Sequence, residues 1–231
     1  MSKACIAVIG AGGKTTAVRS LARRLSGFSV LWTTTTHIYP AAPEDCRLRL
    51  LDPTAEALAA ALAEPGVVCA GVPAGEKLTA LSPESWVAAC KAADYIVCEA
   101  DGSHRLPLKL HRPDEPVLPA ETTHVLIVLG LSALGRPVGE VVHRYALHPA
   151  WAAHPAAPVG VAELCFCAEE AAARCGVPKE NIRLLFNQAD DETHIEAGRQ
   201  AAGALSRQGF ACRVGALQKD DAFLAPWVLG E

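Results

Sequence analysis

A glycine cluster near the start of the chain has the residue types that bind a nucleoside triphosphate. The apolar run from Ala4 to Ile9 is followed by Gly10-Ala11-Gly12-Gly13-Lys14-Thr15-Thr16. Glycines let a backbone wrap a phosphate with its N–H groups turned inward, and a helix N-terminus adds partial positive charge. We expect these seven residues to bind the nucleotide. In that site Lys14 contacts the β- and γ-phosphates as a catalytic residue, Thr15 binds Mg²⁺ and Thr16 supports the α-phosphate.

One position departs from the standard P-loop pattern. That pattern has glycine five residues before Gly13, where this chain has Val8. We therefore expect a tighter loop than usual, and Val8 leaves open whether hydrolysis is limited. The alternative is a glycine-rich turn with a solvated lysine. The apolar run before the cluster and the helical pattern after it favour phosphate binding.

Two further segments place polar residues directly after an apolar run. Four threonines, Thr33 to Thr36, precede His37, and their hydroxyls suit a γ-phosphate or a Mg²⁺ shell. Thr35 is our candidate metal ligand, although threonine also simply favours strands. Glu99 and Asp101 follow the apolar run Tyr95 to Cys98, as in a Walker B element.

The spacing of Glu99 and Asp101 predicts a shared role. A spacing of two puts both carboxylates on one side of the chain if the strand persists. One then holds Mg²⁺ and the other orients the attacking water, so both are candidate catalytic and metal-binding residues. The alternative is a pair of solvated loop acids.

A fourth segment, Asn187-Gln188-Ala189-Asp190, resembles the N-K-x-D element with which GTPases read guanine. Asp190 would accept hydrogen bonds from the guanine N1–H and amino group, and Asn187 would brace the loop. Gln188 replaces the lysine of that element and carries no charge. The segment favours GTP slightly over ATP, and the alternative is a polar turn that caps the next helix.

Strand and helix patterns alternate along most of the chain. We expect strands over residues 3–9, 28–32, 67–70, 95–98, 124–129, 182–186 and 210–214, and helices over 14–25, 54–63, 83–93, 162–175 and 193–208. Apolar runs joined through helices indicate a mostly parallel sheet covered on both faces. We predict a three-layer α/β/α P-loop NTPase-like fold, in which the four polar segments meet beyond the carboxyl ends of the strands.

Length and composition narrow the class of protein. The 231 residues suit one domain, 1–231, with loop-rich insertions around 101–123 and 135–160 that are candidate partner surfaces. A net charge of −4 gives no reason to expect nucleic acid or an anionic membrane as partner. No apolar run approaches a membrane span of about 18 residues. Nine scattered cysteines without a C-x-x-C pair indicate free thiols and a cytoplasmic protein.

Other polar residues carry weaker signals. The histidines of the loop-rich part lack zinc-ligand spacing, and we interpret them as surface residues: His104, His111, His143 and His148. Four cations are candidates for stabilising transferring phosphate charge, and the sequence does not choose among them: Lys109, Arg112, Arg136 and Arg144.

The motifs together resemble the YqeC family. They are G-A-G-G-K-T-T, T-T-T-T-H-I, E-A-D-G-S-H-R-L-P-L-K, L-G-L-S-A-L-G-R-P-V followed by V-H-R, and F-N-Q-A-D. They occur in order from the N-terminus to about Asp190, while the glycine loop alone also looks like that of Mur-type ligases. The family is described as accessory or selenium-cofactor biosynthesis proteins of selenium-dependent molybdenum hydroxylases. The resemblance implies a role in maturing such enzymes.

We therefore expect a Mg²⁺-dependent nucleoside triphosphatase, using GTP or ATP, that acts with a molybdenum hydroxylase or its maturation factors. Two alternatives stay open. One is an ATP-dependent ligase or kinase that activates a small substrate. The other is a chaperone that uses nucleotide as an assembly switch without useful turnover.

Overall fold

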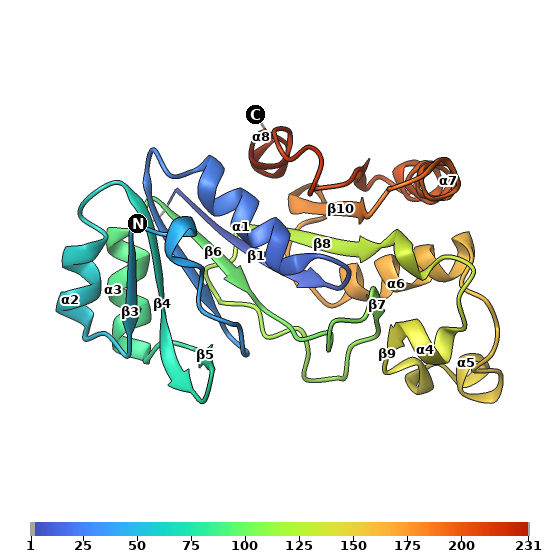
Figure 1. Ribbon diagram of the computed structural model, residues 1–231, viewed down its shortest axis with the longest axis horizontal. Helices are drawn as coiled ribbons and strands as arrows, with labels where there is room; N and C mark the ends of the chain where they lie inside the picture. Colours follow the sequence, from blue (N-terminus) through green and yellow to red (C-terminus); the bar gives the residue numbers. More distant parts are fainter. Residues whose placement is uncertain (1–2, 231) are drawn as a thin grey trace.

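The computed structural model of the protein describes residues 3–230, which form a central β-sheet between two layers of helices (Figure 1). Its parallel strands follow the order β11-β10-β8-β1-β6-β2-β4-β3, and β5 pairs antiparallel with β4. The strands of this sheet are β1 (Ala4–Gly10), β2 (Ser29–Thr34), β3 (Leu48–Leu51), β4 (Gly66–Ala74), β5 (Lys77–Thr79), β6 (Tyr95–Glu99), β8 (His124–Gly130), β10 (Ile182–Asn187) and β11 (Ala211–Val214). Two short strands, β7 (Leu108–Lys109) and β9 (Val142–His143), pair with each other.

Helices cover both faces of the sheet, which explains why its strands are continuous apolar runs. Every residue of β1, β2 and β6 is buried. On one face, Ile6 and Val8 pack with α1 (Lys14–Arg24) and α8 (Leu224–Leu229). The other face packs against α2 (Ala55–Ala61), α3 (Pro83–Ala92), α6 (Val161–Ala173) and α7 (Glu192–Arg207). The predicted three-layer α/β/α fold is confirmed.

The central position of β1 sets the place of the glycine loop. β1 lies between β6 and β8, and Val8 pairs with Glu99 on one side and Leu126 on the other. Val8 is therefore a buried strand residue, and β1 continues to Gly10 before α1 begins at Lys14. The connection is short because the strand occupies positions that a standard P-loop gives to its loop.

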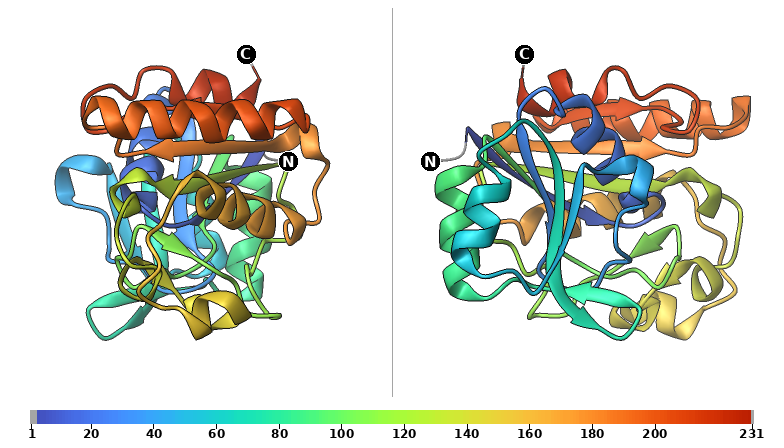
Figure 2. Two further views of the ribbon diagram at one scale, coloured as in Figure 1. Left: turned by 90° about the vertical axis from the view of Figure 1, so that its right-hand side faces the viewer. Right: turned by 60° about the vertical axis from the view of Figure 1, so that its left-hand side comes forward.

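The carboxyl ends of β1, β2, β6, β8 and β10 lie at one edge of the sheet because these strands are parallel neighbours. β4 is longer, and beyond its pairing with β3 it forms a hairpin with β5 (Figure 2). The connection after β8 includes the short helices α4 (Val138–Val141) and α5 (Pro149–Ala153). This edge therefore has several segments with which to build a site.

All seven strands and five helices that the sequence predicts are present. The sequence does not indicate β3, since this edge strand is mostly exposed and lacks a buried apolar run. The helices α4, α5 and α8 have six residues or fewer, too few to show helical periodicity. Residues 135–160 are consequently more structured than expected. Within residues 3–230, no helix has both the length and the apolar character needed to cross a bilayer.

Candidate functional site

The loop between β1 and α1 lies so close to two other strand ends that glycine is required. A Cβ on Gly12 would lie 2.3 Å from the Cα of Gly130, where β8 ends. A Cβ on Gly13 would lie 2.3 Å from the Nδ2 of Asn187, where β10 ends. Both glycines also have positive φ, 78° and 122°, a region that L side chains rarely adopt. Glycine is therefore required at position 12 by the close approach of the β8 backbone, and at position 13 by its φ and by the Asn187 side chain.

The N-terminus of α1 opens on a cleft of about 650 Å³. The residue that precedes the helix, Gly13, has no side chain to cap it, and the first turn contains no acidic residue. N–H groups of a first helical turn have no partner within the helix and attract anions. Gly12, Gly13, Lys14, Thr15 and Thr16 all line the cleft. This end of the cleft is therefore suited to phosphate groups.

Lys14 is buried at the base of the cleft, with 4% of the residue exposed. Its Nζ donates hydrogen bonds to the carbonyl oxygen of Gly10 at 2.7 Å and to the Oγ of Ser103 at 3.2 Å. It also lies 3.2 Å from the Oδ1 of Asp101. The ammonium group is thus fixed beside the loop that it is expected to serve.

Glu99 faces Thr15 across the cleft. The Thr15 hydroxyl donates to Oε2 of Glu99 at 3.4 Å, and Oε1 lies 3.9 Å from the Nζ of Lys14. Burial raises the pKa of Glu99 above its ordinary value, although Lys14 opposes the shift. A hydroxyl and a carboxylate are the oxygen ligands that Mg²⁺ prefers. The pair therefore fits the predicted metal site.

Asp101 lies beneath the loop, and no part of its side chain is exposed. Its Oδ2 accepts hydrogen bonds from the Gly10 N–H at 2.9 Å and from His111 Nε2 at 2.9 Å, and lies 3.0 Å from Lys109 Nζ. Burial by itself would raise its pKa, but Lys14, His111 and Lys109 together hold the pKa of Asp101 far below its ordinary value. Asp101 therefore stays ionised and anchors the loop.

His111 joins this carboxylate to a second one. Its Nδ1 lies 2.8 Å from the Oε2 of Glu170 on α6, so both ring nitrogens have a carboxylate acceptor. Burial lowers the pKa of His111, but the hydrogen bonds to Asp101 and Glu170 raise it by more, and the net shift is upward. The interpretation of His111 as a surface residue was wrong, since only 1% of it is exposed.

The part of the sequence that builds most of this site matches a known protein family. The model of the family described as YqeC protein matches residues 6–146, more than half of the chain. The chain belongs to the YqeC family. It is 37% identical over 147 residues to a protein of Escherichia coli (strain K12) named "Uncharacterized protein YqeC". The aligned part is 61% of this chain and 57% of that relative, so the chain spans little more than half of the relative's length.

The matched part of this YqeC family member contains the loop, Glu99, Asp101 and His111, and it also contains all four cations among which the sequence does not choose. Lys109 donates to Glu115 Oε2 at 3.1 Å, and Arg144 pairs with both oxygens of the same carboxylate. Arg112 pairs with the exposed Asp114. These three cations compensate acids of the protein, and among the four candidates Arg136 lines the cleft.

The residues of the threonine run differ in what they contact: some bond to neighbouring backbone, and others line the cleft. The hydroxyls of Thr33 and Thr34 donate to the carbonyl oxygens of Ala70 and Glu99, at 2.8 and 2.7 Å. The Thr35 hydroxyl donates to the carbonyl of Val117 at 2.6 Å. Thr36 and His37 line the cleft instead. The structure therefore does not bring Thr35 to the expected metal site, because β2 ends at Thr34 and the Thr35 hydroxyl is directed to Val117.

The placement of the two acids after β6 also differs from the expectation. The strand ends at Glu99, so the alternation that would put Asp101 on the same side does not persist. Glu99 lines the cleft, whereas Asp101 is enclosed by three cations below the loop. We therefore revise Asp101 from a metal ligand to a residue that positions the loop and Lys14.

Asn187 and Asp190, like Glu99 and Asp101, lie in different surroundings: Asn187 contacts the glycine loop and Asp190 does not. Asn187 Nδ2 donates to the carbonyl oxygen of Gly12 at 2.9 Å, and its Oδ1 accepts from the N–H of Leu217 at 3.0 Å. Asn187 thus braces the loop, as the sequence suggests. Asp190 is exposed and pairs with Lys219 at 3.4 Å.

Lys219 lines a second cleft, of about 680 Å³, on the other side of Thr16. Thr16 lines both clefts. Asp190 itself is among the lining residues of neither cleft.

Proposed function

We propose that the chain binds the Mg²⁺ complex of a nucleoside triphosphate in the first cleft and hydrolyses it. The observation that carries the proposal is the joint placement of Lys14, Thr15 and Glu99 at a free helix N-terminus. A cation, a hydroxyl and a carboxylate at one phosphate-binding loop are the parts that phosphoryl chemistry needs.

A purely structural role for Lys14 is the main alternative. Lys109 and His111 contact Oδ2 of Asp101, whereas Lys14 faces Oδ1 of Asp101 and Oε1 of Glu99. Among these three cations, Lys14 is the one that lines the cleft. This position favours a phosphate-binding role over a purely structural one.

Each residue then has a definite task. The loop N–H groups and Lys14 stabilise negative charge on the β- and γ-phosphates. Thr15 and Glu99 would hold Mg²⁺, which supplies further charge neutralisation when bound. Asp101 and Asn187 keep the loop in shape by accepting from Gly10 N–H and donating to the Gly12 carbonyl. Little conformational adjustment is then needed when the nucleotide binds.

The proposed biological context is the maturation of selenium-dependent molybdenum hydroxylases. It is supported by the resemblance of the sequence to the YqeC family, and the partner enzyme and a cytoplasmic location belong to the same proposal. The chemistry at the loop does not depend on this context.

Titration of the purified protein with ATP and GTP, by calorimetry with and without Mg²⁺, tests the proposal. We expect saturable binding that needs Mg²⁺, and release of inorganic phosphate. Glu99→Gln should slow phosphate release by at least about tenfold, since it removes a charged oxygen from the metal site. Glu84→Gln on the exposed side of α3 is the matched control. Absence of binding to either nucleotide with Mg²⁺ would refute the proposal.

Asp190 provides a test of base choice. We expect Asp190→Asn to weaken GTP binding about tenfold or more and ATP binding little, because a hydrogen bond to a charged acceptor contributes about 1.5–3 kcal/mol. The dissociation constants of both nucleotides decide the matter, with the neighbouring exposed Glu192→Gln as control. Equal effects on GTP and ATP would mean that this segment is structural.

A further inference from the structure

A strained turn presents a cation to the cleft opposite the phosphate loop. The carbonyl of Ser103 accepts from the N–H of Leu106 at 3.0 Å, which closes a turn over residues 103–106. Its two central residues, His104 and Arg105, have φ of 52° and 64°. Positive φ at both central positions is the pattern of a type I′ turn, which Asn-Gly forms without strain. Histidine and arginine therefore occupy two backbone conformations that asparagine and glycine adopt more easily.

The turn is anchored at both of its ends to the proposed nucleotide site. The Ser103 hydroxyl accepts from Lys14, and the Pro107 carbonyl accepts from the N–H of Gly130 at 2.8 Å. The His104 ring stacks on His143, with 4.6 Å between ring centroids. Backbone strain that the surroundings hold in place is typical of functional sites. The anchoring leaves the Arg105 side chain free at the cleft.

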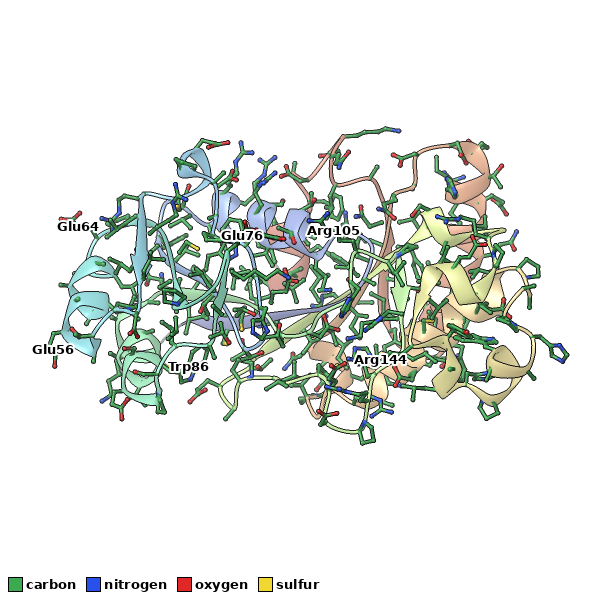
Figure 3. The ribbon with its side chains drawn as sticks, turned by 60° about the horizontal axis from the view of Figure 1, so that its bottom comes forward. Glu56, Glu64, Glu76, Trp86, Arg105 and Arg144 are labelled. Atoms are coloured by element: carbon green, nitrogen blue, oxygen red, sulfur yellow. The ribbon has the colours of Figure 1, made fainter. Side chains whose placement is uncertain are left out.

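More cations than carboxylates line the cleft. Lys77 on the β4–β5 hairpin, Arg105 and Arg136 line it together with Lys14, and among these lining residues Glu99 is the carboxylate. Among residues 3–230, Arg105 and Lys77 have no carboxylate within 4.0 Å, and Arg136 has the exposed Glu140 at 3.8 Å. Figure 3 shows Arg105 well apart from Arg144, the arginine that is already paired with Glu115.

We propose that Arg105, with Lys77 and Arg136, binds a small anionic co-substrate, a carboxylate or phosphate ester, that accepts the γ-phosphoryl group. This inference rests on the proposed nucleotide site and deepens it: when the anion is bound, its oxygen takes the place of water as the acceptor, and without it water accepts the phosphoryl group. An arginine fork matches the two oxygens of such an anion, and the neighbouring cations offset its repulsion from the triphosphate. An acceptor oxygen forms a bond to the γ-phosphorus while the bond to the bridging oxygen breaks. The nucleoside diphosphate leaves with that electron pair, and nothing is oxidised or reduced.

The test measures anion binding to the protein saturated with Mg²⁺ and a non-hydrolysable triphosphate analogue. Malonate and inorganic phosphate are the probes for the two anion classes, and calorimetry or NMR titration is the readout. We expect saturable binding of at least one probe, weakened about tenfold or more by Arg105→Asn, since a charge-assisted pair is lost. Asn tolerates positive φ, so the thermal midpoint of this variant should be equal or higher. Arg207→Asn on exposed α7 is the matched control.

Each other outcome overturns the inference in a recognisable way. If neither probe binds once the analogue is present, the cations serve the nucleotide alone. If Arg105→Asn mainly raises the dissociation constant of the Mg²⁺ nucleotide, Arg105 contacts the triphosphate and no acceptor subsite exists. If the triphosphate analogue does not bind to the unaltered chain, the titration refutes the proposed nucleotide site itself, and not only the anion subsite.

Discussion

Lys14→Met weakens binding of the Mg²⁺ nucleotide by at least about 100-fold, on the estimate that each of two hydrogen bonds to charged oxygens contributes about 1.5–3 kcal/mol. The reason lies in the position of the ammonium group, which is fixed at the start of the loop by the Gly10 carbonyl and Ser103. Methionine keeps much of the buried volume and removes the charge. Calorimetric titration with ATP and GTP measures the loss.

The fold of this variant should survive. When Lys14 is absent, Oδ2 of Asp101 keeps the Gly10 N–H, His111 and Lys109 as partners, whereas Oδ1 loses its contact with the ammonium, so the variant should be folded but less stable. Lys91→Met, on the exposed side of α3, should bind nucleotide like the unaltered chain. Unchanged nucleotide affinity in a folded Lys14→Met protein would mean that the lysine serves Asp101 and not a ligand.

The phosphate loop is the part of the site that the sequence predicts best. Strand, glycines, lysine and helix are consecutive, so local pattern suffices to place Lys14 and Thr15. Glu99 is also predictable, because a buried strand ends directly at it. The parallel sheet follows from continuous apolar runs that alternate with helices. Each of these inferences uses residues that are neighbours in the chain.

The rest of the site depends on contacts between distant segments. His111 pairs with Glu170, 59 residues later, and nothing around either residue marks that pairing. The side on which Asp101 lies depends on where β6 stops pairing, which spacing alone does not set. The turn at His104 and Arg105 cannot be predicted from the sequence, for a different reason. Its residue types are atypical of a type I′ turn, so only the observed backbone shows it.

Asp101→Asn should lower the free energy of unfolding by about 3–5 kcal/mol, the range for removing one partner of a buried ion pair. Oδ2 of the carboxylate serves Gly10, His111 and Lys109, and Oδ1 faces the Lys14 ammonium, so the asparagine would put its amide group in place of one of these two oxygens. Its amide group would also direct a donor at other donors. Urea unfolding measures the change, and Asp114→Asn on the same segment, where the carboxylate is exposed and pairs with Arg112, should leave stability nearly unchanged.

The pH dependence of the unfolding free energy shows whether the loss of stability comes from the Asp101–His111 pair or from general damage to the core. In the unaltered chain the pKa of His111 is raised above its unfolded value, so its contribution is full below the ordinary histidine pKa of about 6.5. That contribution is lost as pH rises through the folded pKa. Without the Asp101 carboxylate the upward shift shrinks, because Glu170 then remains as the acceptor for the ring. The stability of Asp101→Asn should therefore fall less steeply above neutral pH than that of the unaltered chain. Parallel curves would show that Asp101 does not set the charge of His111, and that its role beneath the loop is steric.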